Sequence, residues 1–439
     1  MVNHIRLTRN NVKYLMRFMI LTIVFVGCKK RTDNIPPVVQ ISSPTYMAGF
    51  NVFDFVSVAA SVSDENKLVA VTVDLQNENF SSVIPIIAIS PASKEIAISE
   101  SFYLEDIHLE SGMYYVKVWA YDGVNEKSAY REIFITGAPL EMNNMFLVSS
   151  SVAGEQDWSS FTTGSIVPFH TFQSEYGGAA VNSHHQYLHT LGAESDGLVA
   201  YHPGLVDTLW FKGNPGNLPL PYYGKIKEGS EGLIYVTTTT GKVMSYGQSG
   251  TIGSEVSSPI DHAPDDFFLW NGKIVVEQRH LSTASHVMGV YHPSSGVLDQ
   301  SISFGNDIVS WEIRNDDELF VFSNDLGNQA HMHIYGYSGN YFWEPHGMPT
   351  GRVYDSYRKN NNEVIISHEL GLYHYTYSSN SLIQIESGHS FTKLLFDKVN
   401  NVLYCVEANN LFTYDLNGIQ LAQLVHSDAI EEVLLLYNK

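Results

Sequence analysis

A ladder of aromatic residues recurs along the last two thirds of this 439-residue chain. From the first rung to the last, the spacings are 40, 45, 45, 44, 40 and 39 residues. The rungs are Phe161, Tyr201, Tyr246, Tyr291, Tyr335, Tyr375 and Tyr414. A period near 40 residues indicates a repeat architecture, in which each unit buries its apolar face against its neighbours. No other feature of the sequence constrains the fold as tightly.

The last complete repeat displays the internal pattern of a repeat most clearly. Short apolar runs are separated by turns that contain Asn or Gly, which predicts four strands. The predicted strands cover residues 391–396, 402–406, 411–414 and 419–425. Four short strands per period of about 40 residues are typical of the blade of a β-propeller. We therefore assign the ladder to packing within blades.

The two ends of the repeat region complement one another. Residues 145–172 hold three predicted strands but no inner strand, whereas the apolar run 430–437 has the pattern of an inner strand. Joining them would complete one blade and remove the free sheet edges. The seven rungs thus predict an all-β, seven-bladed propeller over residues 145–439, closed by strands from both ends of the domain. Six or eight blades remain open, because the outer strands are the weakest part of the pattern.

Residues 37–137 show a different pattern, without the repeat. Apolar and polar residues alternate in runs such as 55–62 and 114–121, which predicts an antiparallel β-sandwich. The segment Gly112-x-Tyr-Tyr-Val-x-Val-x-Ala-x-Asp-Gly123 resembles the late strands of bacterial Ig-like and PKD-like modules. That resemblance implies a fold and no activity. We expect a tether over residues 28–36 and a linker over residues 138–144.

The N-terminus has the pattern of a secretory signal. Four basic residues precede the apolar run 18–27, which is too short to span a bilayer. Val26-Gly27-Cys28 resembles the bacterial lipobox, although Phe25 replaces the usual leucine. In lipoproteins the signal peptide, here residues 1–27, is cut before the cysteine, and the thiol is diacylated. An ordinary signal peptide is the alternative, and Met16 is an alternative start.

The lipobox resemblance implies a location. Several acyl chains would anchor Cys28 firmly in a membrane, because one chain alone binds only marginally. The next residues, Lys29-Lys30-Arg31, lack the aspartate that retains enteric lipoproteins in the inner membrane. We expect an outer-membrane lipoprotein of the Bacteroidota type, with the periplasmic or surface-facing leaflet left open.

Composition excludes several classes of function. The formal charge is −21, and −25 once the four basic side chains of residues 1–27 are removed, which disfavours nucleic acid as a partner. The one further cysteine, Cys405, lies in an apolar run and is expected to be a small buried side chain. The sequence contains no nucleophile elbow, phosphate loop, CxxC pair or HExxH helix. We predict no catalytic residue, cofactor or metal ligand from these patterns.

Histidines recur where one repeat connects to the next. His262, His346, His389 and His426 each follow a predicted outer strand, and we expect these connections to surround the central channel. Imidazoles gathered there could bind a ligand or a metal, or act as general bases. Such an arrangement resembles the channel histidines of seven-bladed polysaccharide lyases. The alternative is structural, because Gly388-His389 resembles the Gly-His pair that hydrogen-bonds within WD blades.

Other polar and aromatic residues are predicted at the same face. Loops between second and third strands, together with nearby aromatic residues, would form a crown that could stack on sugar rings and bond hydroxyls. The candidate ligand-binding residues are Tyr222, Tyr223, Arg279, His280, Trp343 and Glu369, in addition to the four histidines. The alternative is that Trp343 is packed between blades.

The favoured hypothesis is a lipid-anchored, non-enzymatic binding or scaffolding protein that captures a glycan or a nutrient. It rests on a large face built from loops without a catalytic signature. Peptides and outer-membrane protein complexes are other candidate partners. The alternative hypothesis is a propeller enzyme, a polysaccharide lyase or hydrolase, that uses the histidines at the mouth of the channel.

Overall fold

The computed structural model describes residues 34–439 apart from residues 163, 194–196, 217 and 219. The chain divides into two compact units, Met1–Pro139 and Leu140–Lys439. Cys28 and the predicted signal segment lie outside the described residues. Within the described part of the chain, no helix has the length and hydrophobicity needed to cross a membrane.

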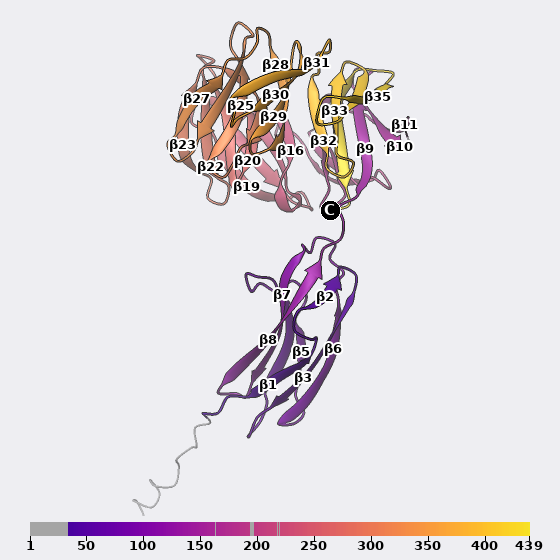
Figure 1. The fold of residues 1–439 in the computed structure, drawn as a ribbon, viewed down its shortest axis with the longest axis vertical. Helices are drawn as coiled ribbons and strands as arrows, with labels where there is room; N and C mark the ends of the chain where they lie inside the picture. Colours follow the sequence, from indigo (N-terminus) through magenta and orange to yellow (C-terminus); the bar gives the residue numbers. More distant parts are fainter. Residues whose placement is uncertain (1–33, 163, 194–196, 217, 219) are drawn as a thin grey trace, which may run out of the picture. The chain divides into compact units, whose positions relative to one another are not determined.

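The first unit consists of two β-sheets (Figure 1). One sheet has the order β1-β3-β6 and the other β2-β8-β7-β4-β5, in which only β2 and β8 run parallel. The strands are β1 (Val38–Ser43), β2 (Ala48–Asn51), β3 (Phe55–Ser63), β4 (Ala70–Gln76), β5 (Ile87–Ile89), β6 (Glu95–Tyr103), β7 (Gly112–Tyr121) and β8 (Glu126–Thr136).

Alternation along β7 explains how this unit is built. Tyr114, Val116 and Val118 are buried in one core formed by both sheets, whereas Tyr115 and Lys117 lie on the outer face. A period of two places successive side chains on opposite faces of a strand. The side chains of β7 that do not point into the core, such as Tyr115 and Lys117, therefore lie on the outer face of the five-stranded sheet.

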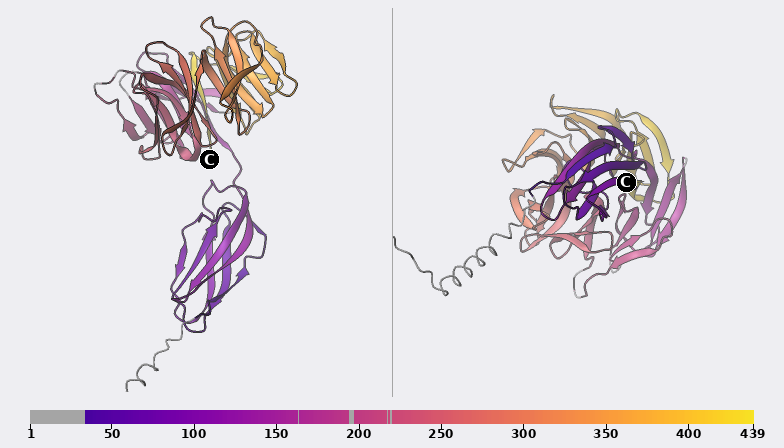
Figure 2. Two further views of the ribbon diagram at one scale, coloured as in Figure 1. Left: turned by 90° about the vertical axis from the view of Figure 1, so that its left-hand side faces the viewer. Right: turned by 90° about the horizontal axis from the view of Figure 1, so that it is seen from below.

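The second unit consists of seven four-stranded antiparallel sheets, which we call blades and which surround a common centre (Figure 2). Blade 1 contains β9 (Met142–Ser149), β10 (Gln156–Thr162), β11 (Ser165–Phe172) and β36 (Ile430–Tyr437). Blade 2 contains β12 (Tyr176–Asn182), β13 (Tyr187–Gly192), β14 (Leu198–Tyr201) and β15 (Thr208–Lys212). Blade 3 contains β16 (Tyr223–Glu228), β17 (Ile234–Thr238), β18 (Lys242–Tyr246) and β19 (Ile252–Ser257). Blade 4 contains β20 (His262–Trp270), β21 (Lys273–His280), β22 (His286–His292) and β23 (Val297–Phe304). Blade 5 contains β24 (Asp307–Ile313), β25 (Glu318–Asn324), β26 (Ala330–Gly336) and β27 (Tyr341–His346). Blade 6 contains β28 (Val353–Asn360), β29 (Glu363–His368), β30 (Gly371–Thr376) and β31 (Ser381–Ser387). Blade 7 contains β32 (Lys393–Asp397), β33 (Val402–Glu407), β34 (Asn410–Tyr414) and β35 (Gln420–Val425). A short 3₁₀-helix, η1 (Ser230–Gly232), joins β16 to β17.

Blade 1 combines strands from both ends of the unit, as the sequence predicts. Its order is β11-β10-β9-β36, and β36 pairs antiparallel with β9. Val433 and Leu435 of β36 are buried with Met145 and Leu147 of β9 in one core. The last strand of the chain thus supplies the inner strand of the first blade, and these seven sheets form a β-propeller.

The aromatic ladder marks one register in all seven blades. Each rung lies on the third strand and pairs with the residue at the equivalent position of the second strand, as Tyr291 does with Ile274 and Tyr375 with Val364. Five rungs are almost completely buried, and Phe161 and Tyr201 are partly buried. Packing is therefore the role of the ladder, and Cys405 is likewise fully buried in a blade core.

Candidate functional site

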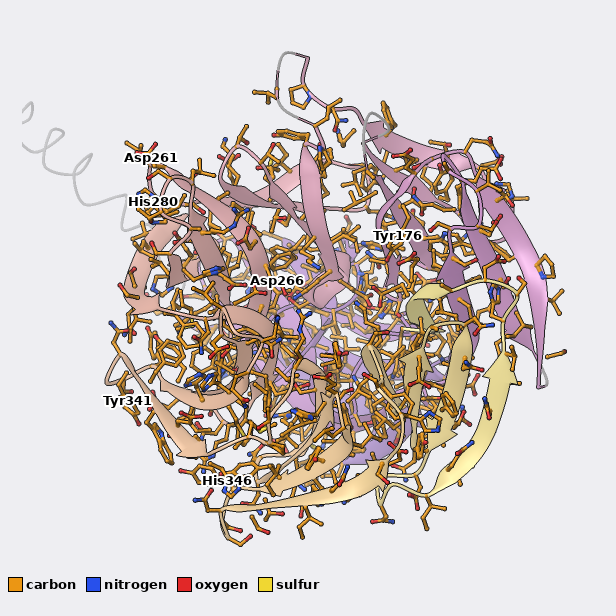
Figure 3. All side chains as sticks on the ribbon, turned by 90° about the horizontal axis from the view of Figure 1, so that it is seen from above. Tyr176, Asp261, Asp266, His280, Tyr341 and His346 are labelled. Atoms are coloured by element: carbon orange, nitrogen blue, oxygen red, sulfur yellow. The ribbon has the colours of Figure 1, made fainter. Side chains whose placement is uncertain are left out.

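A cavity of about 1070 Å³ lies at the centre of the propeller. Residues from all seven inner strands line it, namely from β36, β12, β16, β20, β24, β28 and β32. Many are polar, although inner strands carry apolar residues towards the blade cores on their other face. Figure 3 shows Asp266 and Tyr176 near the centre of the ring of blades. The cavity is therefore a partly enclosed region lined by polar residues from every blade.

Seven of the lining residues, one on each inner strand, connect neighbouring blades. We call them the polar belt: Tyr176, Lys227, Asp266, Ser310, Asp355, Lys393 and Glu432. Opposite charges meet twice in the belt. Lys227 Nζ lies 2.8 Å from Asp266 Oδ1, and Lys393 Nζ lies 3.2 Å from Glu432 Oε2. Glu432 also bonds the hydroxyl of Tyr176. These contacts link blade 3 to blade 4, and blade 7 through blade 1 to blade 2.

Asp355 of blade 6 links this blade to blades 5 and 7. Its Oδ1 accepts hydrogen bonds from Ser310 Oγ of blade 5 at 3.2 Å and from the Ser356 amide at 2.8 Å. Its Oδ2 accepts a hydrogen bond from the Leu394 amide of blade 7 at 2.7 Å. An enclosed carboxylate with this many donors is held in one orientation. The wall of the cavity is therefore rigid on this side.

Enclosure shifts the protonation of the cavity carboxylates. Burial, reinforced by the nearby charge of Asp355, raises the pKa of Glu312 to about 8. Burial also raises the pKa of Asp355. Burial alone would lower the pKa of Lys393, but Glu432 and Asp355 outweigh it and the pKa is raised. At neutral pH the cavity thus offers a protonated carboxyl as donor, ammonium donors and ionised acceptors, which suits a ligand rich in polar groups.

None of the ten candidate ligand-binding residues lines this cavity. Figure 3 shows His280 and His346 towards the outer margin of the propeller. The expectation that the four histidines surround the channel is therefore wrong, because the inner strands carry their own side chains into it. Whether any of the ten contacts a ligand stays a prediction.

Three of the ten come together in blade 4. His262 and His280 are paired across β20 and β21, and their rings lie 4.8 Å apart at close to a right angle. Arg279 is next to them and pairs with Asp265, with Nε 2.8 Å from Oδ2. In blade 4, the end of the second strand therefore lies beside the connection from the preceding blade, on the same face of the propeller, as we predicted for such loops.

Most of the remaining candidates have structural partners. His389 Nδ1 lies 2.8 Å from Glu407 Oε2, and the buried His426 has Nε2 3.3 Å from Ser159 Oγ. Glu369 accepts a hydrogen bond from the Arg352 amide at 3.2 Å. These contacts favour the structural interpretation of the two histidines.

The aromatic candidates do not form a crown. Tyr222 and Tyr223 are buried and pack edge to face in a core formed by blades 2 and 3. Trp343 lies on the outer strand of blade 5, exposed and edge-on to Tyr377 of the next blade. His346 ends the same strand, with its ring 6.1 Å from Tyr375. A shared aromatic platform is therefore absent at these positions.

One group in the described part of the chain has the composition of a metal site. Atoms of Glu277, His286 and Asp307 lie within 4.8 Å of one another. However, Glu277 Oε1 already accepts hydrogen bonds from His286 Nδ1 at 2.9 Å and from the Ile308 amide of blade 5 at 2.8 Å. The side chain of Asn324 makes a comparable link from blade 5 to Val353 of blade 6. Clamping of adjacent blades accounts for the geometry of Glu277.

The sequence does contain a signal for the polar belt that our prediction missed. Ser310 and Asp355 are 45 residues apart, and Lys393 and Glu432 are 39 apart, which are spacings of the ladder itself. A polar residue repeated near the ladder period on the inner strands indicates that a polar wall exists, but not which of two neighbouring residues, such as Asp265 and Asp266, faces the cavity.

Comparisons with known proteins give information on the fold alone. No protein-family model and no curated protein matches the sequence. The computationally designed protein Ika8 is 13% identical, with 66% of this chain and 87% of that chain covered and a TM-score of 0.48. The Dos1 propeller is 10% identical, with 66% and 87% covered and a TM-score of 0.47. A functionally unknown protein from Desulfotomaculum acetoxidans DSM 771 is 15% identical, with 67% and 98% covered and a TM-score of 0.46. At these scores, the assignment as a β-propeller rests on the topology of the seven sheets.

Proposed function

We propose that this protein is a lipoprotein of the bacterial envelope whose propeller captures a polar ligand, such as a saccharide, in its central cavity. The observation that carries the proposal is the polar belt, where ammonium and carboxylate groups from adjacent blades face one enclosed space of about 1070 Å³. Polar groups fixed by their neighbours bind a ligand with little loss of side-chain entropy. The first unit would serve as an Ig-like spacer between the membrane anchor and the propeller.

Ligand capture is tested by Asp266→Asn, with Asp265→Asn as the matched control. Asp266 lines the cavity and pairs with Lys227, whereas its neighbour Asp265 pairs with Arg279 and does not line it. Calorimetric titration of the mature Cys28→Ser chain with neutral, acidic and amino saccharides should identify a ligand. We expect Asp266→Asn to weaken its binding at least about tenfold, equivalent to about 1.4 kcal/mol, and Asp265→Asn to have no effect. Equal affinities of the two variants would contradict a site in the cavity.

The anchor is tested by Cys28→Ser in the full chain, expressed in a Bacteroidota host. We expect the wild type to partition with membranes and to incorporate a labelled fatty acid, and the variant to do neither, because lipidation requires the thiol. The control variant Lys29→Ser changes the next residue and should leave both properties intact. A wild-type chain that carries no label would remove the lipoprotein from the proposal.

A second candidate function is hydrolysis of a glycosidic bond. It is favoured by Glu312 and Asp355, two carboxyl groups in the cavity whose pKa values are both raised. A carboxyl group that stays protonated at neutral pH can act as a general acid. If saccharides that bind are also cleaved, and Glu312→Gln abolishes cleavage but retains binding, the enzyme hypothesis replaces simple capture.

A further inference from the structure

Exposed aromatic rings gather on the outer face of the five-stranded sheet in the first unit. Tyr46, Phe80 and Tyr130 are 64%, 60% and 48% exposed, and they line a hollow of about 600 Å³ with Tyr115 and Glu132. Large aromatic side chains normally bury most of their surface. Three of them that face solvent around one hollow form a surface that folding of the unit does not explain.

The rings are held in a fixed arrangement. Phe80 is stacked on Tyr115, with centroids 5.3 Å apart, and meets Tyr130 at a steep angle, with centroids 6.2 Å apart. Tyr115 pairs with Glu132 across β7 and β8, so the carboxylate lies beside these rings. Glu132 also bonds the Tyr46 hydroxyl, which together with its charge raises the pKa of Tyr46. The hollow therefore combines apolar ring faces with an anchored carboxylate.

The backbone at Phe80 is unfavourable for its side chain. Phe80 has φ +58°, in the left-handed region that glycine or asparagine occupies much more readily. The turn is held by Asn77, whose Oδ1 accepts hydrogen bonds from the amides of Asn79 and Ser81, each at 3.0 Å. An exposed phenylalanine in this conformation costs stability. This observation is independent of the clustering of the rings.

The charges around the hollow favour a neutral, hydroxyl-rich ligand. The Glu132 carboxylate lines the hollow, and Lys117 Nζ lies outside the lining, 5.9 Å from the centroid of the Tyr130 ring. A cationic ligand would meet Lys117, and an anionic ligand would meet Glu132. A pyranose ring presents a C–H face that stacks on aromatic rings. Its hydroxyls accept hydrogen bonds from an ammonium group and donate hydrogen bonds to a carboxylate.

We propose that Tyr46, Phe80, Tyr115, Tyr130 and Glu132 form a binding site for a neutral saccharide on the first unit, in addition to the cavity of the propeller. Phe80 and Tyr130 provide the stacking surface, and Glu132 and Lys117 bond the hydroxyls. This site goes beyond the proposed function, because it assigns binding to the unit that would otherwise be only a spacer. It does not depend on whether the propeller binds anything.

The test is Phe80→Asn, with Phe53→Asn as the matched control. Phe53 is also an exposed phenylalanine of the first unit with positive φ, at +76°, but it does not line the hollow. Asparagine tolerates this backbone conformation, so both variants should fold. Calorimetry would use the mature chain carrying Asp266→Asn, which weakens binding in the propeller cavity, and the Phe80→Asn and Phe53→Asn variants are compared in this same background. The probes are neutral gluco-, manno-, galacto- and N-acetylglucosamine oligosaccharides.

We expect one class of these saccharides to bind, Phe80→Asn to weaken that binding at least tenfold, and Phe53→Asn to leave it unchanged. Glu132→Gln should weaken it less, because the amide retains a hydrogen-bonding oxygen. The proposal is overturned if no saccharide class binds, if Phe80→Asn and Phe53→Asn have equal effects, or if tetramethylammonium binds in place of the saccharides. The last outcome would indicate an aromatic cage for organic cations.

Discussion

Deletion of residues 430–439 unfolds the propeller: this is the largest effect we expect of any change in the chain. The deletion removes β36, whose Ile430, Val433, Leu435 and Leu436 are buried. Burial of four such side chains contributes roughly 6 to 12 kcal/mol, comparable to the entire stability of a typical domain, about 5 to 15 kcal/mol. It also exposes the edge of β9 and opens the ring. Near-ultraviolet circular dichroism and thermal melting should show loss of tertiary structure.

The matched control for the deletion is Glu431→Gln. Glu431 is exposed on the same strand, and its Oε1 accepts a hydrogen bond from Ser150 Oγ at 3.1 Å, which glutamine can also accept. We expect this variant to melt within a few degrees of the wild type. A truncated chain that keeps a cooperative transition at the wild-type temperature would show that closure by β36 contributes little.

Glu312→Gln should change the dependence of stability on pH. Because enclosure raises the pKa of Glu312 to about 8, the folded protein binds this proton more tightly than the unfolded chain. Its contribution to stability is fully present below the unfolded pKa, near 4.5, and is lost as the pH rises to about 8. The loss is about 1.4 kcal/mol per pH unit across this window. Glutamine does not titrate, so the variant should be the more stable protein at pH 8.

Urea denaturation of the wild type and Glu312→Gln at pH 5, 6.5 and 8 measures this effect. Glu344→Gln is the control, because Glu344 is exposed on an outer strand. Parallel stability curves for the wild type and Glu312→Gln would mean that Glu312 is ionised in the folded protein, and would also weaken the case for a general acid in the cavity.

The arrangement of blades could be predicted because the ladder reports a repeated local pairing. Each rung pairs with a residue of the preceding strand that lies between 11 and 17 positions earlier in the chain, such as Leu403 with Tyr414. Short-range pairing of this kind preserves a sequence period. The predicted strands of the last repeat accordingly fall within two residues of β32 to β35.

The cavity wall could not be predicted in the same way, because bulges decide which side chains face the centre. The pairing of β20 with β21 shifts between Pro264 and Asp266, and that of β28 with β29 shifts between Val353 and Asp355. A shift by one residue moves a side chain to the opposite face of a strand. The sequence alone therefore does not distinguish Asp266, which lines the cavity, from Asp265, which does not.

The histidines misled the prediction for a different reason. His389 and His426 lie between an outer and an inner strand as expected, whereas His262 begins an inner strand and His346 ends an outer strand. His389 and His426 bond Glu407 and Ser159. Contacts between residues far apart in the chain, 267 residues for Ser159 and His426, leave no local pattern in a sequence.

The pairing of β9 with β36 also has a consequence for how the protein is made. Ser150 and Glu431 are 281 residues apart, so β9 leaves the ribosome roughly 15 to 55 seconds before its partner at ordinary rates of synthesis. Until β36 pairs with β9, blade 1 lacks its inner strand and presents an unpaired edge, which is where a chain is prone to associate wrongly. Completion of the ring must therefore wait for the last ten residues, and a chaperone that shields the edge of β9 would raise the yield of folded protein.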